Sequence, residues 1–334
     1  MNKKNRVFSG ARPTGPLHLG NYFGGIKGYL DLQERKDLDC LYAVVDLHGI
    51  TSPYNPKNYP QQIQELVLDY LACGLDPKKS HLFIQSQVKE HLELAYYFST
   101  IYPVSRLEQL PTYKDKKLSQ PHYVNLGLLS YPILMAADIL LYKAELVPVG
   151  KDQLPHLELT REVARSFNHL FGETFPLPEA YLTKGAYVPS LTGEGKMSKT
   201  KEDSYISLID DLITIKNKLA KVVTDSGHGK TIPKSGGVNT LLTLVELFMG
   251  KEERTKYENE YLGSGLKYQS LKANLAEQIF NYLKPIQEKR RFYSHQSALI
   301  RSILEEGKEY ASQIAQKTIK EVRNKMGFNK VFSH

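Results

Sequence analysis

Residues that could bind an anion gather near the start of the chain, over residues 7–25. A short apolar run breaks at Ser9-Gly10, a stiff Pro/Gly segment follows, and His18 and Asn21 come where a helix should begin. A strand, a tight loop and a helix N-terminus can form an anion site, because free backbone N–H groups and the helix dipole favour negative charge. An ordinary strand–helix turn rich in Gly and Pro would have the same pattern. The spacing matches neither G-x-G-x-x-G nor the P-loop.

A second group of charged residues lies far downstream, in the run Lys-Met-Ser-Lys-Thr that begins at Lys196. Lys196 and Lys199 carry positive charge on long stems, and two glycines just before them would let the segment close over a ligand. Such lysines could stabilise charge that develops on phosphate groups. We therefore expect a mobile loop over residues 192–203. A polar, Lys-rich segment over residues 106–123, which contains Lys114, is expected to be a second mobile loop.

The elements that position these residues follow from the alternation of short apolar strands and helical patterns over residues 7–191. This alternation predicts an α/β, Rossmann-type fold, a doubly wound parallel sheet covered on both faces by helices. Ligands bind beyond the carboxyl ends of the strands in such sheets, and polar residues follow these strands here. The expected strands are 6–9, 41–46, 82–85, 145–149 and 187–191. The expected helices are 24–34, 60–73, 90–100, 126–141 and 157–171.

After Ser204 the strand patterns stop, and apolar residues recur at helical spacing to about Met326, with Gly327 as a C-terminal cap. We expect Pro285 to interrupt one of these helices. The chain is thus predicted to have a Rossmann-type domain over 1–191, a lid loop over 192–203 and a C-terminal all-helical domain over 204–334. A mobile or dimer-forming insertion is expected around 100–142. Basic side chains in the last part could face a phosphate backbone or form a solvated helix face: Arg290, Arg291, Lys320, Arg323 and Lys325.

Composition narrows the classes of protein. The chain has 334 residues, a formal net charge of +8, 22 tyrosines and no tryptophan. A basic balance permits a polyanionic partner without requiring one. Neither Cys40 nor Cys73 belongs to a C-x-x-C pair, so no cysteine-only metal site is expected. Because no apolar run approaches the ~20 residues of a membrane span and the N-terminus lacks an apolar signal core, we expect a cytoplasmic protein.

The turn His18-Leu19-Gly20-Asn21 resembles the His-x-Gly-His signature of the class I aminoacyl-tRNA synthetases, with Asn21 in the last position. The run that begins at Lys196 resembles the Lys-Met-Ser-Lys-Ser loop of the same class. Residues 134–142, 147–153 and 156–162 are similar to the tryptophanyl-tRNA synthetase family. The resemblance covers most of the chain and weakens after about residue 250.

The resemblance implies a reaction as well as a fold. L-Tryptophan and ATP, with Mg²⁺, would give tryptophanyl-adenylate and pyrophosphate, and tryptophan would then pass to the 3′ end of tRNA(Trp). The enzyme would be a homodimer with no membrane association, with residues 1–191 as its catalytic domain and residues 204–334 as its anticodon-binding domain. No dedicated metal cage is expected from the sequence, because Mg²⁺ held by ATP phosphates needs none.

The resemblance also implies the residues of the site. His18, Asn21, Lys196 and Lys199 would be catalytic. ATP would be bound by Arg12, Pro13, Thr14, Gly20, Asn21, Lys114, Gly150, Lys151, Asp152, Val188, Lys196, Met197, Ser198, Lys199 and Thr200. Tryptophan would be bound by Phe8, His48, Tyr131, Met135, Asp138, Val147, Val149 and Gln153. Of these, Asp138 would accept the indole N–H, and Tyr131 and Gln153 would hold the ammonium group.

Two of these residues carry arguments of their own. The indole nitrogen is only a donor, so a pocket for it needs an acceptor such as Asp138, which phenylalanine would leave unpaired. A lone carboxylate among Met, Ala, Ile and Leu is costly without a task, although a salt bridge on the helix face is an alternative. Arg12 stands where many family members carry Gln. Its guanidinium could pair with the ATP phosphates or with the substrate carboxylate.

Three other functions remain as alternatives. Tyrosyl-tRNA synthetase shares the fold, but residues 134–142 and 156–162 argue against it. A small-molecule adenylyltransferase would need neither the helical second half nor the lid. An RNA-binding relative without catalysis would have no use for His18, Lys196, Lys199 and Asp138.

Overall fold

The computed structural model describes residues 5–150, 153–182, 187–199, 201 and 203–328. Within them, parallel strands form one sheet in the order β3-β2-β1-β4-β5. The strands are β1 (Asn5–Ala11), β2 (Leu38–Val44), β3 (Ser80–Ile84), β4 (Leu146–Val149) and β5 (Glu179–Leu182). The predicted Rossmann-type sheet is confirmed. The strand order reverses between β1 and β4, which is where doubly wound sheets bind their ligands.

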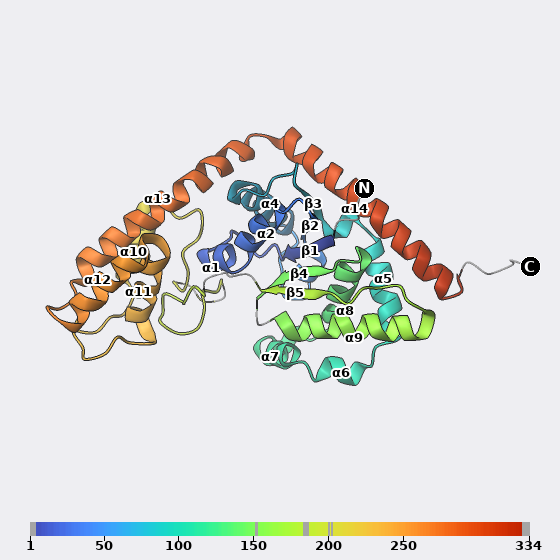
Figure 1. Ribbon diagram of the computed structural model, residues 1–334, viewed down its shortest axis with the longest axis horizontal. Coiled ribbons are helices and arrows are strands. Elements are labelled where there is room, and N and C mark those ends of the chain that lie inside the picture. Colours follow the sequence, from blue (N-terminus) through green and yellow to red (C-terminus); the bar gives the residue numbers. More distant parts are fainter. Residues whose placement is uncertain (1–4, 151–152, 183–186, 200, 202, 329–334) are drawn as a thin grey trace, which may run out of the picture.

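Helices cover both faces of the sheet (Figure 1). Successive strand residues point to opposite faces, so Val7 belongs to one apolar core and Phe8 to the other. The first core is closed by α1 (Leu19–Asn21), a π-helical turn (Tyr22–Ile26), α2 (Lys27–Gln33) and α4 (Tyr59–Cys73). The second is closed by α5 (Glu90–Ser99), α8 (Leu126–Leu141) and α9 (Leu154–Phe171). The predicted bounds of α8 are confirmed.

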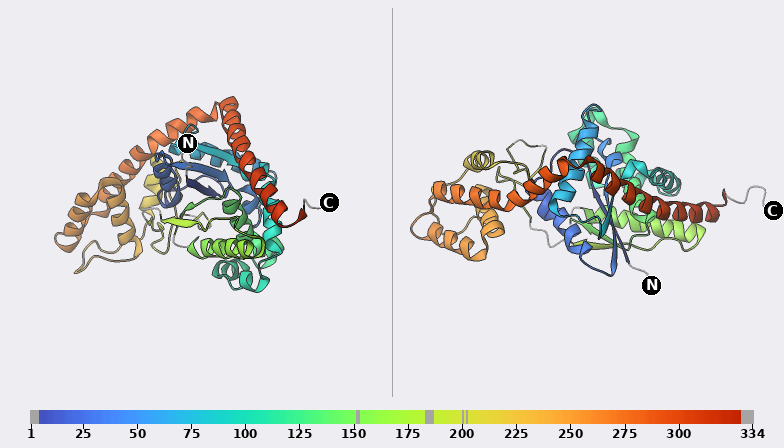
Figure 2. Two further views of the ribbon diagram at one scale, coloured as in Figure 1. Left: turned by 45° about the vertical axis from the view of Figure 1, so that its right-hand side comes forward. Right: turned by 90° about the horizontal axis from the view of Figure 1, so that it is seen from above.

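A group of helices lies to one side of the sheet, as Figures 1 and 2 show. It comprises α10 (Leu212–Ala220), α11 (Gly236–Met249), α12 (Lys251–Leu262) and the first part of α13 (Tyr268–Ser294). α13 then runs back toward the sheet and packs against α4. No helix in the described ranges is long and apolar enough to cross a membrane.

The last helix, α14 (Ser297–Lys325), lies along the sheet and packs against β3 and α5. Gly307 allows this contact, because a Cβ there would stand 2.0 Å from the carbonyl oxygen of Leu82. Gly327 follows the helix with a φ of 91°, as expected of a C-terminal cap. The division into three parts stays a prediction, and this packing favours grouping α14 with the sheet.

Three expectations about local structure are wrong. Residues 187–191 do not form the fifth strand, which is β5, and Pro189 instead makes an isolated bridge with Lys196. Residues 106–123 are largely helical, in α6 (Val104–Glu108), α7 (Pro111–Ser119) and the 3₁₀ turn Pro121–Tyr123. Pro285 lies inside α13 without ending it. The described residues of 192–203 contain no helix or strand, as expected of a loop.

Candidate active site

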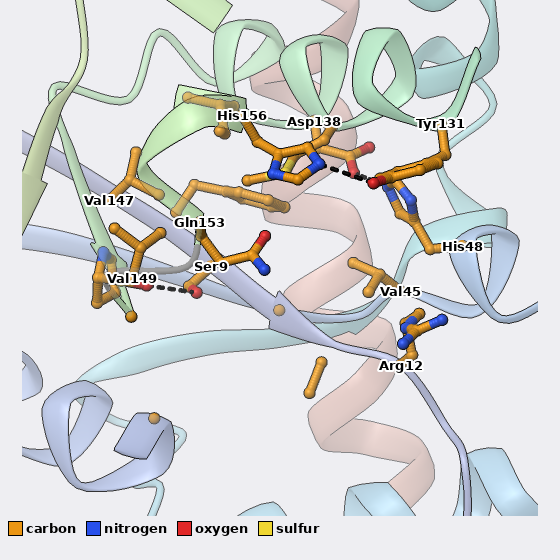
Figure 3. Close-up of a pocket in the computed structure, with 18 of the residues that line it drawn as sticks. Ser9, Arg12, Val45, His48, Tyr131, Asp138, Val147, Val149, Gln153 and His156 are labelled. Atoms are coloured by element: carbon orange, nitrogen blue, oxygen red, sulfur yellow. Dashed lines mark hydrogen bonds and ion pairs between the residues drawn. The ribbon is translucent and has the colours of Figure 1, made fainter. Parts of the chain in front are cut away.

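A cavity of about 450 Å³ opens at the carboxyl ends of β1 and β4, where the strand order reverses (Figure 3). Its volume is in the range of small-molecule sites. Its wall includes every residue predicted to bind tryptophan, and also Arg12, Asn21 and Gly150 from the ATP set. The structure thus brings these residues together from β1, α3 (Asp46–Gly49), α8, β4 and the start of α9. Their roles toward a ligand stay predictions.

Asp138, on α8, is the buried acid of this cavity, with 2% of its surface exposed. Its Oδ2 lies 2.7 Å from Nε2 of His48. Its Oδ1 lies 2.7 Å from Nδ1 of His91 and accepts Nε2 of Gln85, also at 2.7 Å. Nε2 of His91 in turn lies 2.7 Å from the hydroxyl of Tyr142. The carboxylate is therefore held in one orientation by donors from three elements.

The charge state of Asp138 fixes the protons of its partners. Burial by itself raises the pKa of Asp138, but the contacts with His48 and His91 outweigh it and hold the pKa well below the ordinary value. An ionised carboxylate only accepts hydrogen bonds. His48 therefore donates from Nε2 and His91 from Nδ1, and a neutral His91 can accept the Tyr142 hydroxyl at Nε2.

A polar wall faces the opening of the cavity. The hydroxyl of Tyr131 donates to Oγ1 of Thr112 at 2.8 Å and lies 2.7 Å from Nε2 of His156 (Figure 3). The ammonium of Lys116 lies 4.7 Å from the centre of the Tyr131 ring. Burial, and then the charge of Arg12, lowers the pKa of Lys116 to about 8. A cation held above an aromatic ring and beside a second cation is well placed to attract phosphate.

Residues 17–21, here called the signature turn, begin the helical segment after β1. His18 and Asn21 cap this segment reciprocally: Nδ1 of His18 accepts the Asn21 N–H at 3.3 Å, and Oδ1 of Asn21 accepts the His18 N–H at 3.2 Å. Because Nδ1 accepts, the proton of the neutral ring sits on Nε2. Burial, and then the charges of Lys199 and Lys196, lowers the pKa of His18 to about 4. His18 is therefore a neutral donor near pH 7.

The predicted lid touches the signature turn and the loop before it. The ammonium of Lys199 donates to the carbonyl of Gly15 at 2.6 Å and lies 3.5 Å from Oγ1 of Thr14. Burial lowers the pKa of Lys199 to about 8. The Met197 N–H donates to the carbonyl of Val188 at 3.3 Å. Four residues of the predicted ATP set therefore lie together: Thr14, Val188, Met197 and Lys199.

The rest of the predicted ATP set is placed as follows. A Cβ at Gly20 would stand 2.9 Å from the His18 ring, so glycine is required for the close approach there. Lys196 forms an isolated bridge with Pro189, and the backbone of Ser198 bonds to the hydroxyl of Ser204, which follows the lid. Pro13 is buried beside Arg12. Lys114 is exposed and is not part of the cavity wall. Lys151, Asp152 and Thr200 lie outside the described residues.

Several residues of the cavity region were not singled out from the sequence. Some carried a usable signal: Gln85 ends a predicted strand, His156 opens one of the similar stretches, and Lys116 lies in the same Lys-rich segment as Lys114. Ser9 likewise ends a predicted strand, whereas Thr112 and His91 carried no signal, because their roles depend on neighbours distant in sequence. Ser9 lines the cavity and bonds to the Tyr29 hydroxyl and the Pro148 carbonyl.

No group of three His, Cys, Asp or Glu side chains that could hold a metal ion occurs in the described part of the chain. The charges that face the cavity and the lid are mostly positive, from Arg12, Lys116 and Lys199. This arrangement is suited to an anionic ligand beside an apolar, acid-containing pocket.

Comparisons with known proteins identify the family of the chain. The family of class I tRNA synthetases for W and Y matches residues 1–284. A tryptophan–tRNA ligase of Caldanaerobacter subterraneus subsp. tengcongensis is 44% identical over 96% of this chain and 98% of its own length, and one of Nostoc sp. is 42% identical over 98% of each. The tryptophanyl-tRNA synthetase of Campylobacter jejuni, solved with ADP and tryptophan, superposes with a TM-score of 0.84 at 34% identity, over 96% of this chain and 99% of that one. The chain therefore belongs to the class I tRNA synthetases and, within them, to the tryptophan–tRNA ligase family.

Proposed function

We propose that the protein activates L-tryptophan with ATP and transfers it to tRNA(Trp). The observation that carries this proposal is Asp138, an ionised carboxylate at the wall of a largely apolar cavity. In the described residues, Oδ2 of Asp138 accepts a hydrogen bond only from His48. A carboxylate oxygen has room for a second donor, and the indole N–H of tryptophan is such a donor.

The rest of the pocket suits the other parts of tryptophan. Phe8, Met135, Val147 and Val149 would enclose the indole ring. Tyr131 and Gln153, at the polar wall, would orient the ammonium group. Phenylalanine would leave Oδ2 of Asp138 without its second partner, which is a large source of discrimination.

Activation would take place between this pocket and the signature turn. An oxygen of the tryptophan carboxylate attacks the α-phosphorus of ATP, the bond from that phosphorus to the bridging oxygen of the β-phosphate breaks, and pyrophosphate leaves. Nε2 of His18 and the side chain of Asn21 donate to the phosphates. Lys116, Lys196 and Lys199 stabilise the charge that builds on the leaving group, since such transfer needs mainly position and charge.

Mg²⁺ enters this scheme as part of the substrate, bound to the ATP phosphates. Arg12 borders the cavity close enough to lower the pKa of Lys116 and Lys199, so it would contact either the α-phosphate or the tryptophan carboxylate. In the second step a ribose hydroxyl at the 3′ end of tRNA attacks the carbonyl carbon of the adenylate and AMP leaves.

The further predictions on partners belong to the same proposal. The helical region after residue 204 would bind the anticodon part of tRNA(Trp), but Arg290 is not available for it, because it is paired with Asp69 and Glu65. A homodimer would use the insertion around 100–142, where Val104, Leu118 and Leu126 are exposed. The protein would act in the cytoplasm.

Exchange of labelled pyrophosphate into ATP tests the activation step, run in parallel with tryptophan, tyrosine and phenylalanine. We expect exchange with tryptophan alone, followed by charging of tRNA(Trp) in an aminoacylation assay. Exchange with tyrosine would contradict the role of Asp138, and exchange without charging would favour a small-molecule adenylyltransferase. Absence of exchange would favour an RNA-binding relative.

A further inference from the structure

Helix α13 reaches the signature turn through Asp69, a carboxylate that no step above uses. Asp69 lies on α4 and is 1% exposed. Its Oδ2 accepts the backbone N–H of Leu17 at 2.8 Å, and its Oδ1 accepts Nε of Arg290 at 2.7 Å. Arg290 also pairs with Glu65, one turn earlier on α4. One buried carboxylate thus joins α4, α13 and the residue just before His18.

The carbonyl of Leu17 is also connected to α13, through a second set of hydrogen bonds. It accepts the N–H of Leu208 at 2.9 Å. The carbonyls of Leu208 and Asp210 both accept Nε2 of Gln287, each at 2.9 Å. Gln287 and Arg290 are three residues apart on α13 and therefore share a face of the helix. Both backbone polar groups of Leu17 are fixed by partners that α13 holds.

Helix α13 connects these bonds to the helical region, because it spans both parts of the molecule. The helix packs against α10 and α11 in the helical region and against α4 beside the sheet (Figure 1). A displacement of the helical region along α13 would therefore be transmitted to both the N–H and the carbonyl of Leu17. Asp69 also acts on the lid, because its charge raises the pKa of Lys199 against the effect of burial.

We propose that Asp69 and Arg290 are positioning residues of the activation step. Through them, α13 sets the place of the signature turn, and so of His18 and Asn21 at the ATP phosphates. This inference rests on the function proposed above. It predicts a defect on the ATP side of the reaction, whereas an ion pair that only stabilises the fold would affect tryptophan and ATP alike.

The test compares four variants of the full chain with the wild type. They are Arg290→Met, Asp69→Asn, the double variant of these two, and Lys284→Met as a control. Lys284 is an exposed lysine on the same helix. Pyrophosphate exchange at varied ATP should show kcat/KM for ATP reduced about 10- to 100-fold by Arg290→Met, since small displacements of reacting groups are costly. Lys284→Met should match the wild type. Because Asp69 and Arg290 act as one unit, the loss in the double variant should be smaller than the product of the single losses.

Tryptophan binding provides the internal reference. The chain contains 22 tyrosines but no tryptophan, so fluorescence excited at wavelengths that indole absorbs and tyrosine does not reports the Kd of the bound amino acid. The Kd of tryptophan should not change in any variant, because the hydrogen bonds and ion pairs of Asp69 and Arg290 in the described residues go to Leu17 and Glu65 and to each other, none of which lines the Asp138 pocket. Equal losses toward ATP and tryptophan would overturn the proposal.

A readout that needs no activity is amide hydrogen exchange of the peptide that covers residues 17–21. We expect faster exchange there in Arg290→Met and Asp69→Asn than in the wild type or Lys284→Met. Should Arg290→Met not fold, Arg290→Lys keeps the charge beside Asp69 without the forked geometry and should give a smaller loss of the same kind. Unchanged ATP kinetics in a folded Arg290 variant would refute the positioning role. If the wild type itself catalysed no exchange of pyrophosphate into ATP, the proposed function would be refuted instead.

Discussion

His48 and Asp138 meet through Nε2 and Oδ2 at 2.7 Å, on the wall of the cavity at the carboxyl end of the sheet. The other oxygen of Asp138, Oδ1, accepts hydrogen bonds from Gln85 and His91. The histidine therefore directs one defined oxygen toward the pocket. The arrangement gives a buried charge three hydrogen-bond donors and leaves room at Oδ2 for one more, and such donors are the condition for an ionised carboxylate in an apolar site.

Replacement of Asp138 by Asn should weaken tryptophan binding. The amide keeps the shape but removes the charge and places an N–H₂ group against donors, so the loss should be about 1.5–3 kcal/mol, the value of a hydrogen bond to a charged group. Fluorescence titration of tryptophan should report a rise of the Kd of about tenfold or more. ATP binding should be unaffected, and an unchanged Kd for tryptophan would contradict the assignment.

Lys116 and Lys114 provide a matched pair on α7. Lys116→Met should raise the KM for ATP or lower kcat by about 10- to 100-fold in pyrophosphate exchange, because the cation lost is partly buried beside the cavity. Lys114→Met removes the same charge from an exposed position and should have little effect. The reverse ranking would favour the assignment of Lys114 that the sequence suggested.

The pH dependence of ATP use should reflect the two lysines whose pKa is about 8. Burial lowers the pKa of Lys116 and Lys199, so both lose their charge as the pH rises through about 8 in the free protein. Because bound phosphate favours the charged form, kcat/KM for ATP should fall at a lower pH than kcat. In Lys116→Met the alkaline fall of kcat/KM should be shallower. A profile that stays flat to about pH 10 would contradict these shifts.

His18 should remain neutral through the physiological range. With a pKa of about 4, its ring resonances, assigned by their loss in His18→Asn, should not titrate between about pH 8 and about pH 5. The unfolded chain takes up this proton near pH 6.5, before the folded protein does. His18 therefore removes stability as the pH falls from about 6.5 to about 4. A midpoint near 6.5 in the folded protein would show that the site does not suppress the charge.

The fold was largely predictable from the sequence where apolar periodicity was strong. The bounds of α8 follow from such a pattern. The presence of β1 to β4 does too, although the ends of these strands differ from the predicted ones by up to three residues. β5 was missed because it is an edge strand of only four residues, with half-exposed and exposed side chains. The segment around Val188 looked like a strand because it contains apolar residues. Val188 and Leu191 are indeed buried, but in the described part of the chain the backbone of this segment bonds to Met197 and Ser204 and not to the sheet.

Two further errors came from reading local signals without their context. The segment that contains α7 was predicted as a loop from its polarity, although lysine and leucine favour helix and Pro111 occupies a first-turn position that suits it. Pro285 was expected to interrupt a helix, but the packing of α13 on both sides outweighs the hydrogen bond that proline removes.

The candidate site was predictable in its short motifs and in the residues that the family resemblance assigned. The bonds of Gln85 and His91 to Asp138 were not predictable, because both side chains reach it from other elements, although Gln85 ends a predicted strand. The same holds for Asp69 and Arg290, which are separated by most of the chain and meet only when α13 returns to α4.

The contact between α14 and β3 also bears on how the protein is made. β3 is an edge strand of the sheet, and Gly307 brings the backbone of α14 directly against Leu82. While the ribosome is still translating the helical region, this covering helix has not yet been synthesised, so one side of the nascent sheet is bare. Exposed strand edges favour pairing with other chains. Synthesis in the cell should therefore be most vulnerable to aggregation before α14 emerges, and a nonsense mutation shortly before Ser297 should yield an insoluble product rather than a smaller active enzyme.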